Sequence, residues 1–212
     1  MEGLKIMIAV DHSITRFGIK VLCNQTFKEP EILEIKTLGE LYKQISYHKP
    51  NLVILDLIFN NLNCLSIIPD LVKLQHGSNV FILSNANETT YSDRVIESGA
   101  KGFIHKDCDN ETFKAAIQRV ACGQYYMSQD AYLEQLERLN MKKVEKNPFD
   151  LLSNKELEIV HYLTQGCSTT HISEKSRLAM STVSTYKNRI FSKLQIKNVV
   201  ALMELASTFQ LK

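Results

Sequence analysis

The sequence predicts two domains: an α/β domain with a five-stranded doubly wound parallel sheet, followed by a small all-α domain of four helices. Up to residue 122, short β-branched apolar runs alternate with amphipathic stretches of helical length, a pattern typical of βαβ units. After Pro148 only helical patterns follow. The 212 residues are 44% hydrophobic and 23% charged, which suffices for two compact units and argues against intrinsic disorder.

The first domain, residues 1–124, is expected to alternate strands and helices. The predicted strands are 5–10, 31–36, 52–55, 80–83 and 102–105. The predicted helices are 14–24, 38–47, 63–74, 88–98 and 110–121. In a doubly wound sheet the functional groups follow the C-terminal ends of the strands. This rule selects Asp11, Asp56, Ser84 and Lys106.

Residues 125–149 are interpreted as a linker that contains a helix. Tyrosine and leucine residues recur with helical spacing between 132 and 139, and the charged stretch ends at Pro148. We expect a flexible hinge near 141–149.

The second domain, residues 150–212, begins with a capping box. Ser153 is followed three residues later by Glu156 before an apolar run, and Gly166 is expected to end this helix. The remaining predicted elements are helices over 169–176, 181–194 and 198–208, with a tight turn at 177–180.

Basic residues concentrate near the C-terminus, although the formal net charge of the whole chain is only +2. Residues 1–125 carry 13 basic and 14 acidic side chains, whereas residues 150–212 carry 8 and 5. Six basic residues and no acidic one fall within 175–197, where nucleic-acid phosphates could bind. On charge alone, an ordinary solvated basic face is an equal alternative.

Cysteine usage and hydropathy point to a cytoplasmic protein with no membrane association. The five cysteines occur singly without a CxxC pair, which indicates neither a disulfide framework nor a zinc ribbon. No apolar run approaches the about 20 residues that span a bilayer, and the N-terminus leads into a strand without a cleavage site.

The residues selected at the strand ends suit phosphoryl chemistry. Carboxylate oxygens of Asp11 and Asp56 are hard ligands of the kind that Mg²⁺ prefers. An Asp beside a divalent cation can act as a nucleophile toward a phosphodonor, while Lys106 and Ser84 can neutralise and hydrogen-bond the transferred group. Each residue alone is weak evidence, because Asp residues at strand ends are common and a lone Lys after a strand is usually solvated.

Residues 4–122 resemble the receiver domain of two-component response regulators, which has a flavodoxin-like fold. The resemblance rests on Ile6-Met-Ile-Ala-Val-Asp11-His-Ser-Ile-Thr-Arg16-Phe-Gly18, Pro50-Asn-Leu-Val-Ile-Leu-Asp56-Leu, Phe81-Ile-Leu-Ser84 and Gly99-Ala-Lys-Gly-Phe103-Ile-His-Lys106. It implies that Asp56 is the phosphoacceptor and that Lys106, Ser84 and Phe103 form the switch. Phosphate on Asp56 would draw Ser84 inward, and Phe103 would follow.

The resemblance also implies an Mg²⁺ site formed by Asp11, Asp56 and the backbone carbonyl of Ile58. Two positions depart from the family pattern. Val10 stands where the family has the first of two adjacent acids, which predicts weaker metal binding. Asn60 stands where the family has proline, which predicts a less restrained loop after Asp56.

The helix predicted over 181–194 has one apolar stripe and one small, polar face. The stripe consists of Val183, Tyr186, Ile190 and Leu194. The polar face consists of Ser181, Ser184, Thr185, Asn188 and Ser192, flanked by Arg189, Lys187 and Lys193. Short polar side chains can read base edges while flanking cations meet phosphates. On periodicity alone, an ordinary solvated amphipathic helix is the favoured interpretation.

Residues 151–206 resemble the LuxR-type helix-turn-helix. The resemblance rests on Leu152-Ser-Asn-Lys-Glu156-Leu-Glu-Ile-Val, Gly166-Cys-Ser168, Ile172 and Ser181-Thr182-Val183-Ser-Thr-Tyr-Lys-Asn-Arg-Ile190-Phe-Ser-Lys193-Leu194. It implies phosphate contacts by Thr182 and Lys193 and base reading by Ser184, Thr185 and Asn188. The full predicted DNA-binding set is Thr182, Ser184, Thr185, Lys187, Asn188, Arg189 and Lys193. Departures from the family pattern are Ser176 for a scaffold leucine, Ala179 for an N-cap serine and Ser184 for a common lysine.

A receiver followed by such a reader resembles the NarL/FixJ family of bacterial transcriptional regulators. The leading hypothesis is a non-enzymatic regulator that binds double-stranded DNA, is phosphorylated on Asp56 by a sensor histidine kinase and forms a homodimer when activated. The alternative is a phosphorylation-independent DNA-binding regulator whose atypical receiver senses a ligand or protein partner. A protein-interaction adaptor without a DNA role is a third hypothesis, and an independent enzyme is the least favoured.

Overall fold

The computed structural model describes residues 3–74, 79–140, 147–209 and 211, which fall into two compact units. The units comprise residues 1–134 and 135–212. The division falls within helix α6 (Gln129–Asn140), inside the predicted linker. Most of the predicted hinge, residues 141–146, lies outside the described residues.

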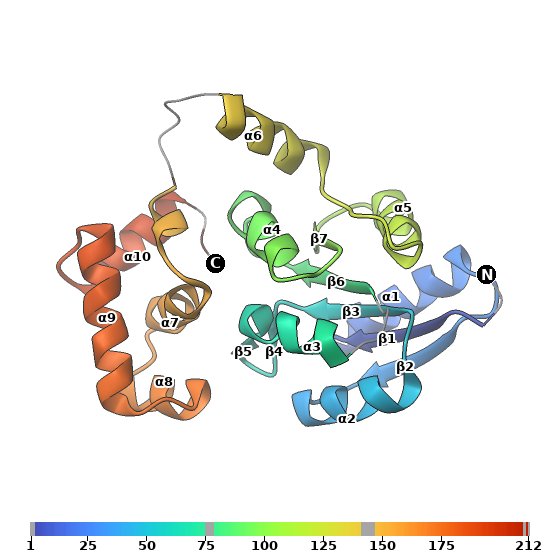
Figure 1. The fold of residues 1–212 in the computed structure, drawn as a ribbon, viewed down its shortest axis with the longest axis horizontal. Helices are drawn as coiled ribbons and strands as arrows, with labels where there is room; N and C mark the ends of the chain where they lie inside the picture. The colour runs from blue at the N-terminus through green and yellow to red at the C-terminus, as the bar shows by residue number, and fades with distance from the viewer. Residues whose placement is uncertain (1–2, 75–78, 141–146, 210, 212) are drawn as a thin grey trace. The chain divides into compact units, whose positions relative to one another are not determined.

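The first unit contains the predicted five-stranded parallel sheet (Figure 1). The strands are β1 (Lys5–Ala9), β2 (Glu31–Ile35), β3 (Leu52–Asp56), β6 (Asn79–Ser84) and β7 (Gly102–His105), in the spatial order β2-β1-β3-β6-β7. The register pairs Asp56 with Leu83 and Ser84 with His105. Residues that end β3, β6 and β7 therefore emerge along one edge, as the strand-end rule predicts.

Helices cover both faces of this sheet. Helices α1 (Ser13–Thr26) and α5 (Asn110–Ala121) pack on one face through a buried cluster that includes Ile8, Val10, Cys23 and Phe113. Helices α2 (Leu38–His48), α3 (Ile68–Leu74) and α4 (Glu88–Glu97) belong to the other face. Burial of apolar side chains on both faces explains why the strand sequences are continuously apolar.

The helix predicted over 63–74 is wrong in its first part. Residues after Asp56 form a short antiparallel hairpin, β4 (Ile58–Phe59) and β5 (Leu62–Asn63), followed by a 3₁₀ turn, η1 (Cys64–Ser66), and only then by α3. Asn60 and Asn61 have positive φ angles of 52° and 57°, which suit a two-residue hairpin turn. The spacing of apolar residues does not indicate this turn. The sequence signal for it is the Asn60–Asn61 pair.

The second unit is all helical, as predicted. It contains η2 (Pro148–Leu151), α7 (Asn154–Thr164), α8 (Thr169–Ser176), α9 (Met180–Leu194) and α10 (Val199–Thr208). The capping box of Ser153 and Glu156 is present at the start of α7. In the turn between α8 and α9, Arg177 adopts the left-handed conformation and Ser173 donates its hydroxyl hydrogen to the Leu178 carbonyl at 2.6 Å. None of the helices in the described ranges is long and apolar enough to cross a membrane.

Candidate functional site

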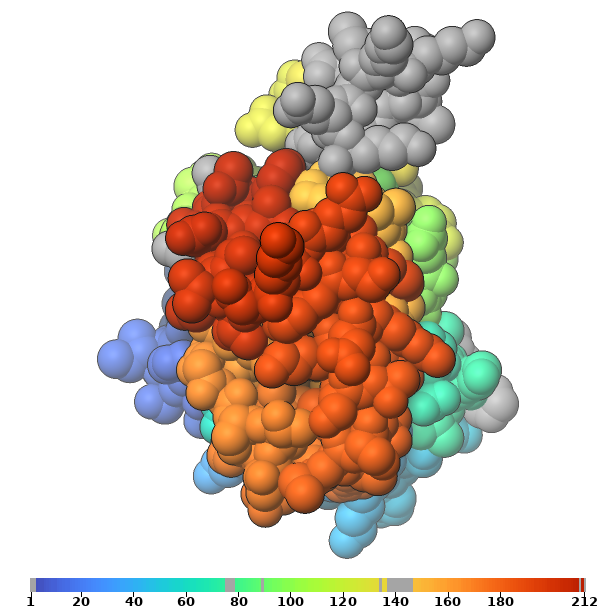
Figure 2. Space-filling model, turned by 90° about the vertical axis from the view of Figure 1, so that its left-hand side faces the viewer, coloured from blue at the N-terminus to red at the C-terminus, as the bar shows by residue number. Residues whose placement is uncertain are grey.

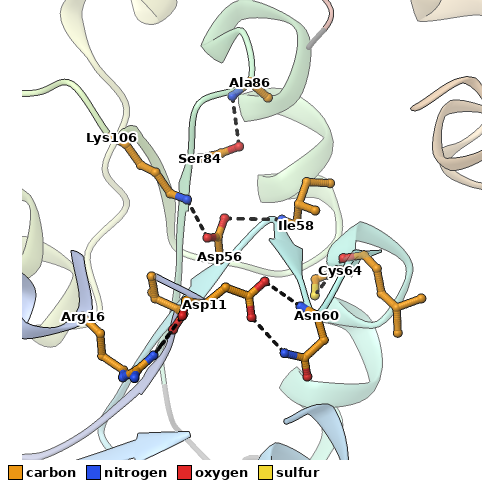
Figure 3. Close-up of polar contacts among 11 residues, drawn as sticks. Asp11, Arg16, Asp56, Ile58, Asn60, Cys64, Ser84, Ala86 and Lys106 are labelled. Carbon is orange, nitrogen blue, oxygen red and sulfur yellow. Dashed lines mark hydrogen bonds and ion pairs between the residues drawn. The ribbon is translucent and has the colours of Figure 1, made fainter. Parts of the chain in front are cut away.

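The buried Asp56 and the half-buried Lys106 form an ion pair at the carboxyl edge of the sheet (Figure 3). The Lys106 ammonium lies 2.5 Å from one carboxylate oxygen of Asp56, and the Ile58 amide donates to the other at 3.4 Å. Burial raises the pKa of Asp56 above its usual value, an effect that Lys106 and the Ile58 amide only partly offset. Asp56 is 2% exposed, so its carboxylate is desolvated and oriented by its partners.

Ser84 ends β6 and Phe103 lies in the adjacent strand β7. The Ser84 hydroxyl accepts a hydrogen bond from the Ala86 amide at 3.0 Å, which orients it at the start of the β6–α4 loop. Phe103, in β7, is already fully buried. The predicted movement of Ser84 and Phe103 on phosphorylation of Asp56 stays a prediction.

Asp11 is held by the hairpin that follows Asp56. Its two carboxylate oxygens accept hydrogen bonds from the backbone amide and the side-chain amide of Asn60, both at 2.8 Å (Figure 3). The Asn60 side chain also donates to the Lys36 carbonyl at 3.1 Å, at the end of β2. The prediction that asparagine at this position leaves the loop less restrained is therefore wrong, because the amide ties the hairpin to two strand ends.

Arg16 fixes the loop that carries Asp11. Its guanidinium donates to the carbonyl of Val10 at 2.6 Å and to that of Asp11 at 3.2 Å, and it pairs with Glu34 at 3.0 Å. Val10 itself is fully buried in the cluster beneath α1 and α5. Position 10, where the receiver family has an acidic residue, therefore belongs to the hydrophobic core of this protein.

Asp11 and Asp56 offer oxygen ligands of the type that Mg²⁺ prefers, but these carboxylates are few. Mg²⁺ keeps several waters and is usually bound by one or two carboxylates, which Asp11 and Asp56 supply. Within the described ranges, no three His, Cys, Asp or Glu side chains gather into a metal-binding group. Both oxygens of Asp11 are also engaged by Asn60. The residues fit a metal ion only if some of these contacts rearrange.

The second unit presents the polar face of α9 to solvent. Val183, Ile190 and Leu194 are buried, while Tyr186 is half-buried. The exposed residues are Ser181, Ser184, Thr185, Asn188, Arg189, Ser192 and Lys193, with Thr182 and Lys187 half-buried. Figure 2 shows the outer surface of this unit in orange to red. A surface hollow of about 260 Å³ on α9 is lined by Ser181, Thr182, Thr185, Tyr186 and Arg189.

Lys193 has a structural partner within the unit. Its ammonium lies 2.7 Å from a carboxylate oxygen of Glu156 and 3.1 Å from the Leu151 carbonyl, so it ties α9 to the start of α7 and to η2. This ion pair gives Lys193 a role in holding the unit together, and its predicted phosphate contact stays a prediction. Lys187 lies over the Phe191 ring at 5.6 Å, and the Thr185 hydroxyl donates to the Ser181 carbonyl at 2.9 Å.

Sequence reasoning missed the roles of Asn60, Arg16 and Glu34. In the sequence, Arg16 is one residue of the first receiver-like motif and Glu34 lies within the strand predicted over 31–36, and neither pattern indicates that the two side chains pair. The one available signal was the Asn-Asn pair two residues after Ile58, since consecutive asparagines favour a turn with positive φ angles.

A strand-end Asp–Lys pair on a doubly wound sheet and a separate helix-turn-helix unit together define a receiver-linked DNA-binding protein. Comparison with known proteins agrees. Residues 6–118 match the response regulator receiver domain, and residues 150–206 match the bacterial regulatory proteins of the luxR family. The chain belongs to the NarL/FixJ-type response regulators and is a DNA-binding response regulator of the two-component LuxR type.

Similar proteins span nearly the whole chain. The transcription regulator BvgA of Bordetella pertussis is 31% identical, over 95% of this chain and 96% of its own. The oxygen regulatory protein NreC of Staphylococcus haemolyticus is 29% identical, over 96% of each chain. The structure of RcsB from Salmonella enterica serovar Typhimurium, bound to promoter rprA with the phosphomimetic BeF3⁻, has a TM-score of 0.75 at 19% identity, over 97% of this chain and 99% of that chain. That likeness supports the fold.

Proposed function

We propose that this protein is a cytoplasmic transcription regulator whose binding to double-stranded DNA is controlled by phosphorylation of Asp56 by a sensor histidine kinase. The observation that carries the proposal is the ion pair of the buried Asp56 with Lys106 at the strand ends of a receiver that continues into a helix-turn-helix unit. The RcsB structure, described as bound to a promoter with a phosphomimetic, supports DNA binding by the same architecture. The comparisons give no support to a ligand-sensing receiver.

The phosphoryl group would be received by an oxygen of Asp56. As this oxygen forms a bond to phosphorus, the P–N bond of the kinase's phosphohistidine breaks and its electron pair stays on the imidazole. Lys106 would move from the Asp56 carboxylate to the phosphoryl oxygens, and the Ser84 hydroxyl would donate to them. A bound Mg²⁺, held by Asp11, Asp56 and the Ile58 carbonyl, would offset negative charge there.

The reader would use the exposed face of α9. Ser184, Thr185 and Asn188 lie where they could reach base edges, while Thr182, Lys187 and Arg189 could meet phosphates. We leave Lys193 out of the contacting set because Glu156 already holds it. A homodimer formed on activation would place two such helices on adjacent half-sites and raise affinity through effective concentration.

The test combines intact mass, light scattering and DNA binding, each with Mg²⁺ and acetyl phosphate. The wild type should gain about 80 Da, the mass of a phosphoryl group, and should shift to a dimer that binds DNA more tightly. Asp56→Ala should do neither. Asp107→Ala is the matched control, because Asp107 lies close by in sequence to Lys106 but its side chain is 88% exposed. No adduct with acetyl phosphate or with partner kinases would contradict the proposal.

A further inference from the structure

Residue 60 occupies both carboxylate oxygens of Asp11. The backbone amide donates to one oxygen and the side-chain amide to the other, across 49 residues of sequence. The side-chain amide also reaches the Lys36 carbonyl. Its two hydrogens can thus serve two acceptors at once, which fixes the amide orientation.

The turn conformation makes these contacts possible. At φ 52°, Asn60 occupies the left-handed region, which asparagine tolerates better than most residues. Proline, which the family usually has here, is fixed near φ −65° and has no amide hydrogen. The change from proline to asparagine therefore supplies both the backbone donor and the side-chain donor that hold Asp11.

The two carboxylates at this edge of the sheet, Asp56 and Asp11, both have partners already. Lys106 pairs with Asp56, and Val10 contributes no second carboxylate beside Asp11. The amide hydrogens of Asn60 satisfy the remaining carboxylate. A divalent cation on Asp11 would compete with these amide groups for the carboxylate oxygens and would be repelled by the hydrogens that point at them.

We propose that Asn60 restrains the metal site: its side-chain amide competes with the divalent cation for Asp11, so that metal binding requires the β4–β5 hairpin to release this carboxylate. The inference rests on the Mg²⁺ site of the proposed function and adds a residue that sets its affinity. Metal binding and the conformation of the hairpin after Asp56 are thereby coupled.

Asn60→Gly tests the competition with little strain. Glycine keeps the left-handed turn and the backbone amide but removes the side-chain amide, which frees one oxygen of Asp11. Mn²⁺ is the probe, with free ion measured by electron paramagnetic resonance, and Mg²⁺ is measured by displacement. We expect Asn60→Gly to bind about tenfold more tightly than the wild type, the equivalent of one hydrogen bond to a charged group.

Two further variants separate competition from a general effect on the turn. Asn61→Gly makes the same change in the same turn at φ 57° and should leave Mn²⁺ affinity near that of the wild type. Asn60→Asp replaces the donor with a carboxylate and should bind Mn²⁺ most tightly. Equal or weaker binding by Asn60→Gly and Asn60→Asp, or no Mn²⁺ binding by any form, would overturn the inference.

The phosphate adduct distinguishes this inference from the proposed function. If all forms gain the adduct but bind Mn²⁺ equally, Asn60 does not compete with metal and the phosphorylation proposal stands. If Asn60→Gly binds Mn²⁺ more tightly while no form gains an adduct, the competition is real and the phosphorylation proposal fails.

Discussion

At the scale of single residues, Glu156 performs two tasks in the second unit. Its carboxylate caps α7 by accepting from the Ser153 amide at 2.7 Å, and it pairs with Lys193 of α9 at 2.7 Å. Glu156 is 3% exposed. Burial raises its pKa, but the contacts with Lys193 and Ser153 lower it more, so that its pKa in the folded protein lies below the usual value.

A pH dependence of stability follows from the lowered pKa of Glu156. Because the folded state favours the ionised carboxylate, the stabilisation is complete above the usual pKa of glutamate and disappears as pH falls through the folded value. Glu156→Gln should cost about 1–3 kcal/mol at pH 7, and this cost should shrink toward pH 3. Urea unfolding followed by circular dichroism measures the difference at each pH. A difference that stays constant with pH would contradict the assigned ion pair.

Substitution of Lys193 tests the same Glu156–Lys193 ion pair. Lys193→Met leaves the Glu156 carboxylate buried with only its backbone and hydroxyl donors, so we expect lower stability at pH 7 and a higher pKa of Glu156. Carbon-13 NMR of the Glu156 carboxyl measures that pKa. The proposed DNA contacts remain in place, so a loss of DNA affinity beyond the loss of folded protein would restore Lys193 to the contacting set.

At the scale of elements, α9 begins without the capping side chain that the other helices of its unit possess. Its N-cap is Ala179, which makes no side-chain hydrogen bond, whereas Ser168 caps α8 and Asn198 caps α10. The backbone of Ala179, at φ −64° and ψ 146°, is already in the extended region that a capping residue adopts.

Ala179→Ser should therefore stabilise the protein by about 1 kcal/mol, because the serine oxygen can accept from an unpaired amide of the first turn of α9. The free energy of unfolding in urea measures the change. Ser168→Ala makes the opposite change at α8 and should destabilise by a similar amount. A neutral or destabilising Ala179→Ser would show that the start of α9 is constrained by something other than capping.

At the scale of the whole molecule, the two units differ in charge. The whole chain has a net charge of +2, and basic residues are in excess in residues 150–212, which contain 8 basic and 5 acidic side chains. Two of those bases are held by acids of the same unit, Lys155 by Glu158 and Lys193 by Glu156. Helix α9 carries three cations, Lys187, Arg189 and Lys193, and Glu156 already pairs with the last of them.

The salt dependence of DNA binding should reflect this small number of contacts. A plot of log affinity against log salt concentration should have a shallow negative slope for the wild type, and Arg189→Gln should reduce the magnitude of that slope by about 1. Lys114→Met removes one charge from the first unit, where Lys114 pairs with Glu111, and should leave the slope unchanged. Fluorescence anisotropy over a salt series measures both. An unchanged slope for Arg189→Gln would exclude its phosphate contact.

The sequence by itself determined which segments form strands and helices and which side chains end the strands. Apolar periodicity reports the burial of a residue relative to its own element, so the sheet, the capping box at Ser153 and the shared edge of Asp56 and Lys106 were predictable. The tertiary structure alone decided which distant partners meet. Asn60 reaches Asp11 across 49 residues and Lys193 reaches Glu156 across 37, through a turn and a helix packing that periodicity does not encode. Contacts of that kind depend on the register and placement of whole elements, and they determine how the candidate site is held.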